Sequence, residues 1–406
     1  MYRVYASVQK HIPLMSVLIC LFCACTDPMS QSTNQLSSLP QRLDQRLNQD
    51  LVGSISIDLD VMDSFLLPDD VGSSFDLSLS DQQAPFDSND PLDEAVPHQH
   101  LDQSMDQSVL TQFDSDVAQG MTSHLRAWLA NRIDERAEQI GLAIPSLARP
   151  DLNGGAFGGL ANDDDQLQHT PILFIHGNSD RALGGELGGW SATVNYFREA
   201  GYRSAELYAT TYGPAQVNRA LTEAYQHSVE NVLRIRLLIE FVLAYTGADQ
   251  VKILTHSLGT TLTRRALLGG WMEDQRDQID LGPPLTDSVK TFVSIAGAHL
   301  GLSSCYVSSS PVCSADLGLY PGQLTPLGVV GRSRLLETLN ASPGYEGQFR
   351  ISLWSPADEL VGGGCLVWGL NTCQLPAYTD DYRLPGLSHL EVRDQTTDLQ
   401  FDLMSR

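Results

Sequence analysis

The sequence is short of positive charge. Its 406 residues carry 25 Lys and Arg against 49 Asp and Glu, a formal net charge of −24. Nucleic acids and anionic membrane surfaces attract basic proteins, so this balance argues against both as partners. Residues 51–120 contain no Lys or Arg at all. Such a segment repels itself and buries too little apolar surface to offset its ordering entropy, so we interpret residues 26–120 as a disordered acidic linker.

The N-terminus lacks an apolar run long enough for a comfortable membrane span. Its apolar residues 12–24 are interrupted only by Ser16 and follow Arg3 and Lys10. This pattern is typical of a signal peptide, which we place at residues 1–25 and expect to be removed on export. Ala24 before Cys25 resembles a bacterial lipobox, which favours acylation of Cys25 and a cell-envelope lipoprotein. Cleavage near Ala24 without acylation, giving a secreted protein, is the alternative.

Few cysteines follow the leader. An even number of them in an exported chain suggests two disulfides, and spacing favours the local pairs Cys305 with Cys313 and Cys365 with Cys373. A metal site is the weaker interpretation because no histidine interleaves these cysteines. Residues 162–165 could bind calcium, but adjacent carboxylates on a loop are more often solvated. We therefore predict no metal centre.

The remaining chain alternates apolar runs of strand length with segments of helical periodicity. Helices are expected at 121–143, 190–200 and 261–268, with one long or broken helix over 215–245. Strands are expected at 171–175, 205–212, 251–254, 289–295 and 349–354. This order predicts one α/β domain over residues 121–406, with a mostly parallel, doubly wound sheet. Residues 302–345, rich in Gly, Ser and Pro, interrupt the alternation. They are interpreted as an insertion over the carboxyl edge of the sheet, without helix or strand periodicity.

One turn indicates the chemistry. Ser257 lies between the strand at 251–254 and the helix at 261–268, within a T-x-S-x-G pattern. A nucleophile elbow needs small residues two places before and after the serine, a need that Gly259 meets and Thr255 meets less well. The helix behind the serine directs its N–H groups at an anion forming on the substrate. Ser257 is therefore the predicted nucleophile, and an ordinary helix-capping serine is the alternative.

The partners of this serine are expected on loops after other strands. The apolar run 171–175 ends in His176-Gly177-Asn178, a loop that can supply an oxyanion donor. In α/β-hydrolases the acid and then the histidine follow the serine. Asp358 stands just after the strand at 349–354, and His389 is the one histidine downstream of it. Other carboxylates remain as rivals for the acid, namely Glu359 first and then Asp316, Asp380 and Asp381.

These motifs fall in one order and resemble the secreted class 2 lipases, especially those that depolymerise native polyhydroxybutyrate. The similarity runs from Pro171 to the C-terminus and rests on residues 175–180, 255–259, 295–306 and 358–362, with Cys365 and Cys373. It implies an α/β-hydrolase fold and a triad of Ser257, Asp358 and His389. It also implies an oxyanion hole formed by the backbone N–H groups of Asn178 and Leu258. Thr255 departs from the family, which usually has alanine or glycine there.

The sequence thus predicts an exported serine carboxylic-ester hydrolase, a lipase or esterase acting on neutral apolar esters without metal or organic cofactor. A polyhydroxyalkanoate depolymerase is the alternative within this class, and a non-catalytic surface-binding lipoprotein is the alternative outside it. The expected partner is a lipid or polyester substrate. We expect a monomer that touches a membrane only through a lipid anchor. In the insertion, Tyr306 and Tyr320 are predicted to contact the substrate.

Overall fold

The computed structural model describes residues 120–406, so the predicted leader, Cys25 and nearly all of the acidic linker lie outside the described residues. The helices are α2 (Ser123–Ile140), α3 (Ser191–Glu199), α4 (Val229–Thr246), α5 (Leu258–Leu268), α6 (Arg334–Asn340), α7 (Glu391–Asp394) and α8 (Thr397–Ser405). The strands of the main sheet are β1 (Ala156–Phe157), β2 (Ile172–Ile175), β3 (Leu207–Thr210), β4 (Val251–His256), β7 (Val289–Ile295), β10 (Phe349–Trp354) and β13 (Asp380–Arg383). No described helix is long and apolar enough to cross a bilayer.

The main sheet has seven strands in the order β1-β3-β2-β4-β7-β10-β13. All neighbours are parallel except β1, which pairs antiparallel with β3 at one edge. Strands β2 and β4 are buried along their whole length, as expected of central strands covered on both faces. The carboxyl ends of β2, β4 and β10 therefore meet at one edge of the sheet, and this topology confirms the predicted α/β-hydrolase fold.

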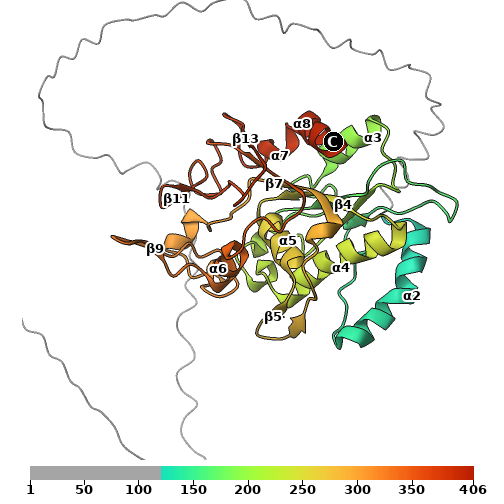
Figure 1. The fold of residues 1–406 in the computed structure, drawn as a ribbon, viewed down its shortest axis with the longest axis horizontal. Helices are drawn as coiled ribbons and strands as arrows, with labels where there is room; N and C mark the ends of the chain where they lie inside the picture. Colours follow the sequence, from blue (N-terminus) through green and yellow to red (C-terminus); the bar gives the residue numbers. More distant parts are fainter. Residues whose placement is uncertain (1–119) are drawn as a thin grey trace, which may run out of the picture. The chain divides into compact units, whose positions relative to one another are not determined.

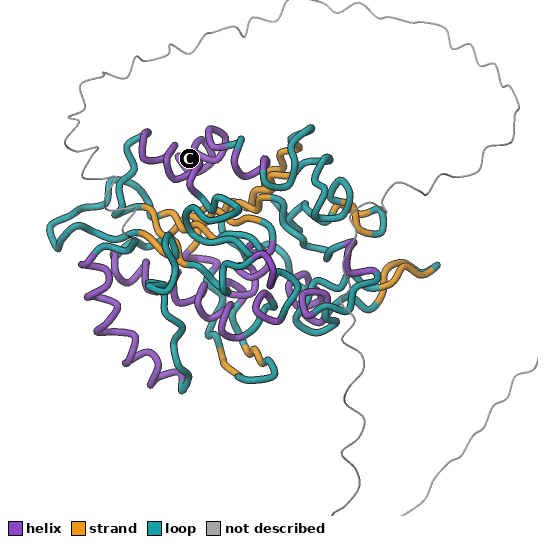
Figure 2. The backbone as a smooth tube through the Cα atoms, turned by 180° about the vertical axis from the view of Figure 1, so that it is seen from behind, coloured by secondary structure: helices purple, strands orange, loops and turns teal. Residues whose placement is uncertain are grey.

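Helices cover both faces of this sheet, as Figures 1 and 2 show. Alternate side chains of a strand point to opposite faces, so β2 contributes to two cores. Leu173 and Ile175 pack in the core beneath α2, α4 and α5, whereas Ile172 and Phe174 pack in the core beneath α3, α7 and α8. Continuous apolar runs such as Ile172–Ile175 form because neither face of the sheet meets water.

Local signals set the helix ends. Ser228 caps α4 by accepting a hydrogen bond from Asn231 N, and Gly247 ends it in the left-handed conformation. Of the two forms expected over 215–245, the structure has the broken helix, with α4 as its second part. Its first part forms two 3-10 turns, Val217–Arg219 and Glu223–Tyr225. The start of α5 was placed three residues late, since Leu258 is already helical.

The insertion differs from the irregular segment that the sequence suggested. It contains α6, the hairpin β8 (Gln323–Thr325) and β9 (Gly328–Val330), and two 3-10 turns, Ser303–Tyr306 and Pro311–Cys313. A second hairpin, β11 (Leu366–Val367) with β12 (Leu370–Asn371), extends from the loop after β10. The elements are too short for a periodic pattern to show in the sequence. The hairpin β5 (Trp271–Glu273) and β6 (Gln278–Asp280) also lies outside the main sheet.

Both cysteine pairs are the predicted local ones. Cys305 is joined to Cys313, with Cα atoms 5.1 Å apart, and Cys365 to Cys373, with Cα atoms 5.4 Å apart. The first disulfide connects the two 3-10 turns of the insertion, and the second closes the β11–β12 hairpin. Disulfides persist in oxidising compartments, so the two pairs fit an extracellular protein.

We expect reduction of the disulfides to lower the free energy of unfolding. Each short cross-linked loop restricts the unfolded chain and so contributes about 2 to 3 kcal/mol to stability. Thermal unfolding of the Cys305→Ser/Cys313→Ser and Cys365→Ser/Cys373→Ser variants measures each contribution separately. Peptide mapping of the unreduced protein tests the pairing itself. A peptide that joins Cys305 to Cys373 would contradict the local scheme.

Candidate active site

Ser257 lies in the turn between β4 and α5. Its φ of 54° and ψ of −127° belong to a region that L-residues rarely adopt. Its amide donates to Ile295 O at 2.9 Å, which carries the pairing with β7 one residue beyond β4. The Ser257 hydroxyl makes no capping hydrogen bond to α5. Ser257 thus lies at a strained strand-to-helix turn without capping the helix, which is the geometry that a nucleophile elbow requires.

Close packing explains the residues that flank Ser257. A Cβ atom on Gly259 would lie 2.1 Å from the carbonyl oxygen of His176, so only glycine fits there. Thr255 is fully buried, yet its hydroxyl donates to Val293 O at 2.8 Å and lies 3.0 Å from the hydroxyl of Thr260. A buried hydroxyl with hydrogen-bond partners carries little penalty, so threonine is accommodated at the position where the family pattern has a smaller residue.

The loop after β2 passes directly beside this turn. A Cβ atom on Gly177 would lie 3.1 Å from Cβ of Ser257 and 2.8 Å from Nδ1 of His256. His176 anchors the loop, because its Nδ1 donates to Gly177 O at 2.7 Å and its Nε2 accepts from Tyr212 N at 3.1 Å. Burial lowers the pKa of His176 to about 3, so the ring is neutral and serves as a fixed support.

Asn178 is held by its side chain, which leaves its main-chain N–H free. The Nδ2 group donates to Ala220 O at 2.9 Å, and Oδ1 accepts from the Ser179 hydroxyl at 2.8 Å. Within residues 120–406, neither the N–H of Asn178 nor that of Leu258 donates to another residue. The structure thus leaves two unused donors near Ser257, one on the loop after β2 and one at the first residue of α5, which are the two positions predicted for an oxyanion hole.

Asp358 and His389 meet as predicted. Nδ1 of His389 lies 2.7 Å from Oδ2 of Asp358, and both side chains are almost completely buried. The other oxygen of Asp358 accepts the N–H groups of Leu360 and Val361 at 2.9 and 2.8 Å. An ionised carboxylate only accepts, so the proton of the neutral imidazole sits on Nδ1 and the Nε2 lone pair is free. No hydrogen bond joins His389 to Ser257 in the described residues, and such bonds are often long in free enzymes.

The rival carboxylates have other roles. Glu359 accepts the main-chain N–H of His389 at 3.0 Å, so the two adjacent acids hold the same histidine at different atoms. Asp316 pairs with Arg334 at 2.5 Å, and Asp381 accepts from the Trp354 indole at 3.0 Å. Asp380 begins β13. Of these carboxylates, only Asp358 bonds to the His389 imidazole ring.

His256 was not singled out from the sequence. Its ring lies 4.7 Å from that of His389 between centroids, and its Nε2 is 3.2 Å from His389 O. Since a carbonyl only accepts, Nε2 carries the proton. Burial, assisted by the nearby His389, holds the pKa of His256 well below its ordinary value. The neutral ring thus connects the end of β4, next to Ser257, to the main chain of the loop that carries His389.

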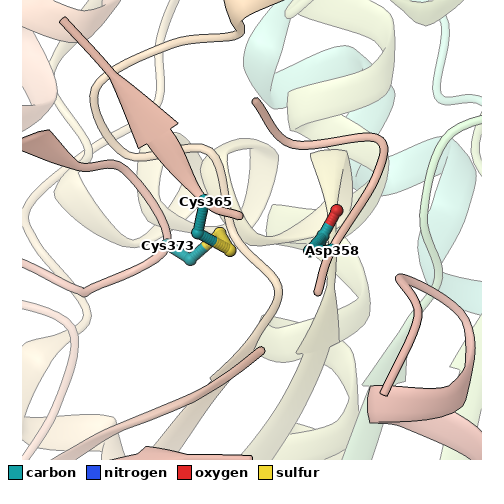
Figure 3. A group of neighbouring side chains, drawn as sticks. All are labelled: Asp358, Cys365 and Cys373. Carbon is teal, nitrogen blue, oxygen red and sulfur yellow. A yellow bond between two sulfur atoms is a disulfide. The ribbon is translucent and has the colours of Figure 1, made fainter. Parts of the chain in front are cut away.

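Figure 3 shows the Cys365–Cys373 disulfide beside Asp358. The two sulfur atoms and a carboxylate oxygen lie within 4.8 Å of one another, as metal ligands would. A metal requires thiolates, however, and both sulfur atoms are used in the disulfide. The two cysteines therefore form a disulfide cross-link next to the Asp358 carboxylate that bonds to His389.

A cavity of about 760 Å³ lies elsewhere, at the N-terminal end of α4. Its walls include Arg149 and Arg234, which pair with Asp151 at 2.7 Å and with Glu230 at 3.0 Å. None of Ser257, Asp358 and His389 lines it. The predicted site residues therefore meet outside this cavity.

Comparison with known proteins gives a family. The protein-family model described as Lipase (class 2) matches residues 169–402. No curated protein matches the chain. Among solved structures, the chain resembles Aspergillus fumigatus lipase B, with 14% identity and a TM-score of 0.42 over 64% of this chain and 58% of that one. It also resembles a monoacylglycerol lipase of Paleococcus ferrophilus, with 16% identity and a TM-score of 0.36. That match covers 62% of this chain and 97% of the lipase chain. The family match spans more than half of the sequence, and the chain belongs to the class 2 lipase family.

Proposed function

We propose that the protein hydrolyses neutral carboxylic esters through Ser257, His389 and Asp358. The hydrogen bond between His389 Nδ1 and Asp358, beside the elbow that carries Ser257, is the observation that supports this function most directly. It leaves Nε2 of His389 as the one basic atom of the ring. A serine at an elbow, a neutral imidazole and an orienting carboxylate are the parts that acyl transfer requires.

The reaction follows from these positions. Ser257 Oγ attacks the ester carbonyl carbon while its proton moves to Nε2 of His389, and the N–H groups of Asn178 and Leu258 stabilise the oxyanion. The tetrahedral adduct collapses, the bond to the alcohol oxygen breaks, and the alcohol takes the proton from Nε2. Water then loses a proton to Nε2 and attacks the acyl-enzyme. The second tetrahedral adduct collapses, the bond from the acyl carbon to Ser257 Oγ breaks, and Oγ takes the proton from Nε2 as the acid leaves. The sequence of steps uses no metal or organic cofactor.

The surface beside the site favours an uncharged, water-insoluble ester. Residues 300–315, 317–331 and 360–379 contain no charged side chain, although the chain as a whole carries −24. Large exposed apolar side chains project from these segments, at Val307, Leu324, Leu327, Leu360, Leu366 and Leu370. Several large apolar side chains exposed on segments without charge favour contact with another apolar surface. We assign the substrate on this ground as a neutral lipid or polyester.

Contacts hold these segments together. The Tyr306 ring lies 4.1 Å from that of Trp368, and its hydroxyl accepts the Trp368 N–H at 2.8 Å. The Trp368 indole donates to Gly322 O at 3.2 Å, so the β11–β12 hairpin rests on the base of the β8–β9 hairpin. Tyr320 is half-buried in the same insertion. The insertion and the loop that carries Asp358 therefore form one surface.

Three substrates assayed side by side test the function. The full-length protein is compared on a short soluble ester, a long-chain triglyceride emulsion and amorphous polyhydroxybutyrate. Turnover of the emulsion identifies a lipase, and turnover of the polymer identifies a polyhydroxyalkanoate depolymerase. Labelling by a fluorophosphonate separates both from a non-catalytic binding protein. An unlabelled protein that hydrolyses none of the three would contradict the proposal.

Removal of Tyr306 and Tyr320 should impair turnover of long or polymeric esters and spare a short one. The double alanine variant loses the contact between the Tyr306 and Trp368 rings, whereas a short acyl group ends near Ser257. We expect a fall of about tenfold or more in kcat/KM on the emulsion, and less than about twofold on the soluble ester. Tyr196→Ala, an exposed tyrosine of α3 whose ring contacts Phe401, is the matched control because it lies outside these segments. Equal losses on both substrates would exclude substrate selection by the insertion.

Export is the remaining part of the proposal. Both disulfides support an oxidising destination. The predicted signal peptide and the acylated Cys25 would then attach the enzyme to the cell envelope, with residues 26–120 as a tether. Mass spectrometry of the mature N-terminus distinguishes an acylated cysteine from a free one.

A further inference from the structure

A buried ion pair joins the two loops on either side of Ser257. Nη1 of Arg393 donates to Oδ2 of Asp180 at 2.5 Å, and the two side chains are 1% and 2% exposed. Asp180 follows Asn178 by two residues, and Arg393, in α7, follows His389 by four. The pair therefore connects the loop with the proposed oxyanion donor to the loop with the proposed base.

Further hydrogen bonds complete both groups. Oδ1 of Asp180 accepts the main-chain N–H groups of Arg181 at 2.8 Å and Gly189 at 3.1 Å. Arg393 also donates from Nη2 to Leu187 O at 2.7 Å, and from Nε to Asp394 at 2.6 Å. The guanidinium thus gathers the segment after Asn178 around α7.

Stability alone is a poor reason for such a pair. Desolvation of two charges can exceed their attraction, so an apolar pair of similar size is often at least as stable. Burial raises the pKa of Asp180, which shows that its ionised form is held at a cost. A buried ion pair can instead fix one arrangement of the chain. Here it fixes two loops relative to each other, through residues that are 213 positions apart in the sequence.

We propose that Asp180 and Arg393 are positioning residues, which set the oxyanion-hole loop against the His389 loop. The inference rests on the proposed function. An oxyanion donor must come within about 2.7 to 3.1 Å of the developing charge while the base stays in reach of the serine proton. Asn178 and His389 follow different strands, and the pair makes them move as one body. A misplacement of about 1 Å costs on the order of 100-fold in rate.

We call the Asp180–Arg393 ion pair the clamp. A double-mutant cycle that measures kcat tests its positioning role. Asp180→Asn and Arg393→Met, in the full chain and on a short soluble ester, should each lower kcat by about 10- to 100-fold with KM changed less than about threefold. Because both remove the same connection, the double variant should be little worse than either single variant. Arg393→Lys keeps the charge and should recover part of the loss. It also keeps the test open if Arg393→Met fails to fold.

A second buried pair provides the control. Arg264 and Glu346 are fully buried and bonded at 2.8 Å, but they join α5 to the segment before β10 and contact neither catalytic loop. Arg264→Met and Glu346→Gln should lower Tm by a similar amount while kcat stays within about threefold. A trifluoromethyl ketone, which forms a charged tetrahedral adduct with an active serine, should lose affinity in Asp180→Asn and not in Glu346→Gln.

The outcomes separate the two proposals. Wild-type kcat in Asp180→Asn, additive losses in the cycle, or losses that the Arg264 and Glu346 variants share would overturn the clamp. An inactive wild-type protein contradicts the proposed function instead. Selective, non-additive loss of kcat together with weaker binding of the ketone supports the clamp.

Discussion

Ser257→Ala is expected to abolish ester hydrolysis and leave the fold intact. The nucleophile is lost, so kcat should fall by at least about 10⁴-fold. The small rate that remains would come from substrate binding and the oxyanion hole. The hydroxyl makes no capping hydrogen bond, and alanine accepts φ of 54° no worse than serine does, so Tm should not fall. Initial rates on a soluble ester, with thermal unfolding of the same sample, measure both quantities.

Ser228→Ala is the matched control, because Ser228 caps α4 through its side chain. Loss of that cap should cost about 1 kcal/mol of stability and leave kcat unchanged. The two serines should thus show opposite effects, one on rate and one on stability. Activity of Ser257→Ala above a few percent of wild type would remove Ser257 from its proposed role.

His389→Ala should be nearly as damaging as Ser257→Ala, whereas Asp358→Asn should leave more activity. The imidazole moves the proton, while the carboxylate only orients it and stabilises its charged form. An asparagine can present an N–H to Nδ1 and favour the wrong tautomer, so we expect Asp358→Asn to lose about 10³- to 10⁴-fold in kcat.

Glu359→Gln is the control for this assignment. Its amide oxygen can still accept the His389 main-chain N–H, and the loss should stay below about tenfold. Measuring kcat for the three variants at one pH gives their order. If Glu359→Gln were the most damaging, the acid would have been assigned one residue too early.

Much of this site could be predicted because its signals are local. The elbow is a five-residue pattern, and the strands around it are continuous apolar runs that a buried parallel sheet requires. Asp358 and His389 were found from their order after Ser257, and the structure joins them at 2.7 Å. Their catalytic roles remain a proposal.

The features missed depend on contacts between distant parts of the chain. Asp180 and Arg393 are 213 residues apart, and no pattern near either one indicates its partner. Strands β1 and β13 are short edge strands with weak periodicity. The family pattern made Thr255 a doubtful residue, because only the backbone of β7 reveals the acceptor that its hydroxyl uses.

The Cys365–Cys373 disulfide beside Asp358 links the activity of the protein to the time at which this disulfide forms in a cell. While the thiols of Cys365 and Cys373 are still reduced, the segment that carries the acid lacks its covalent brace. With the proposed export, full activity would then arise only after the chain has reached an oxidising compartment. Under the proposed activity, ester-containing lipids inside the producing cell would be spared by the timing of one oxidation.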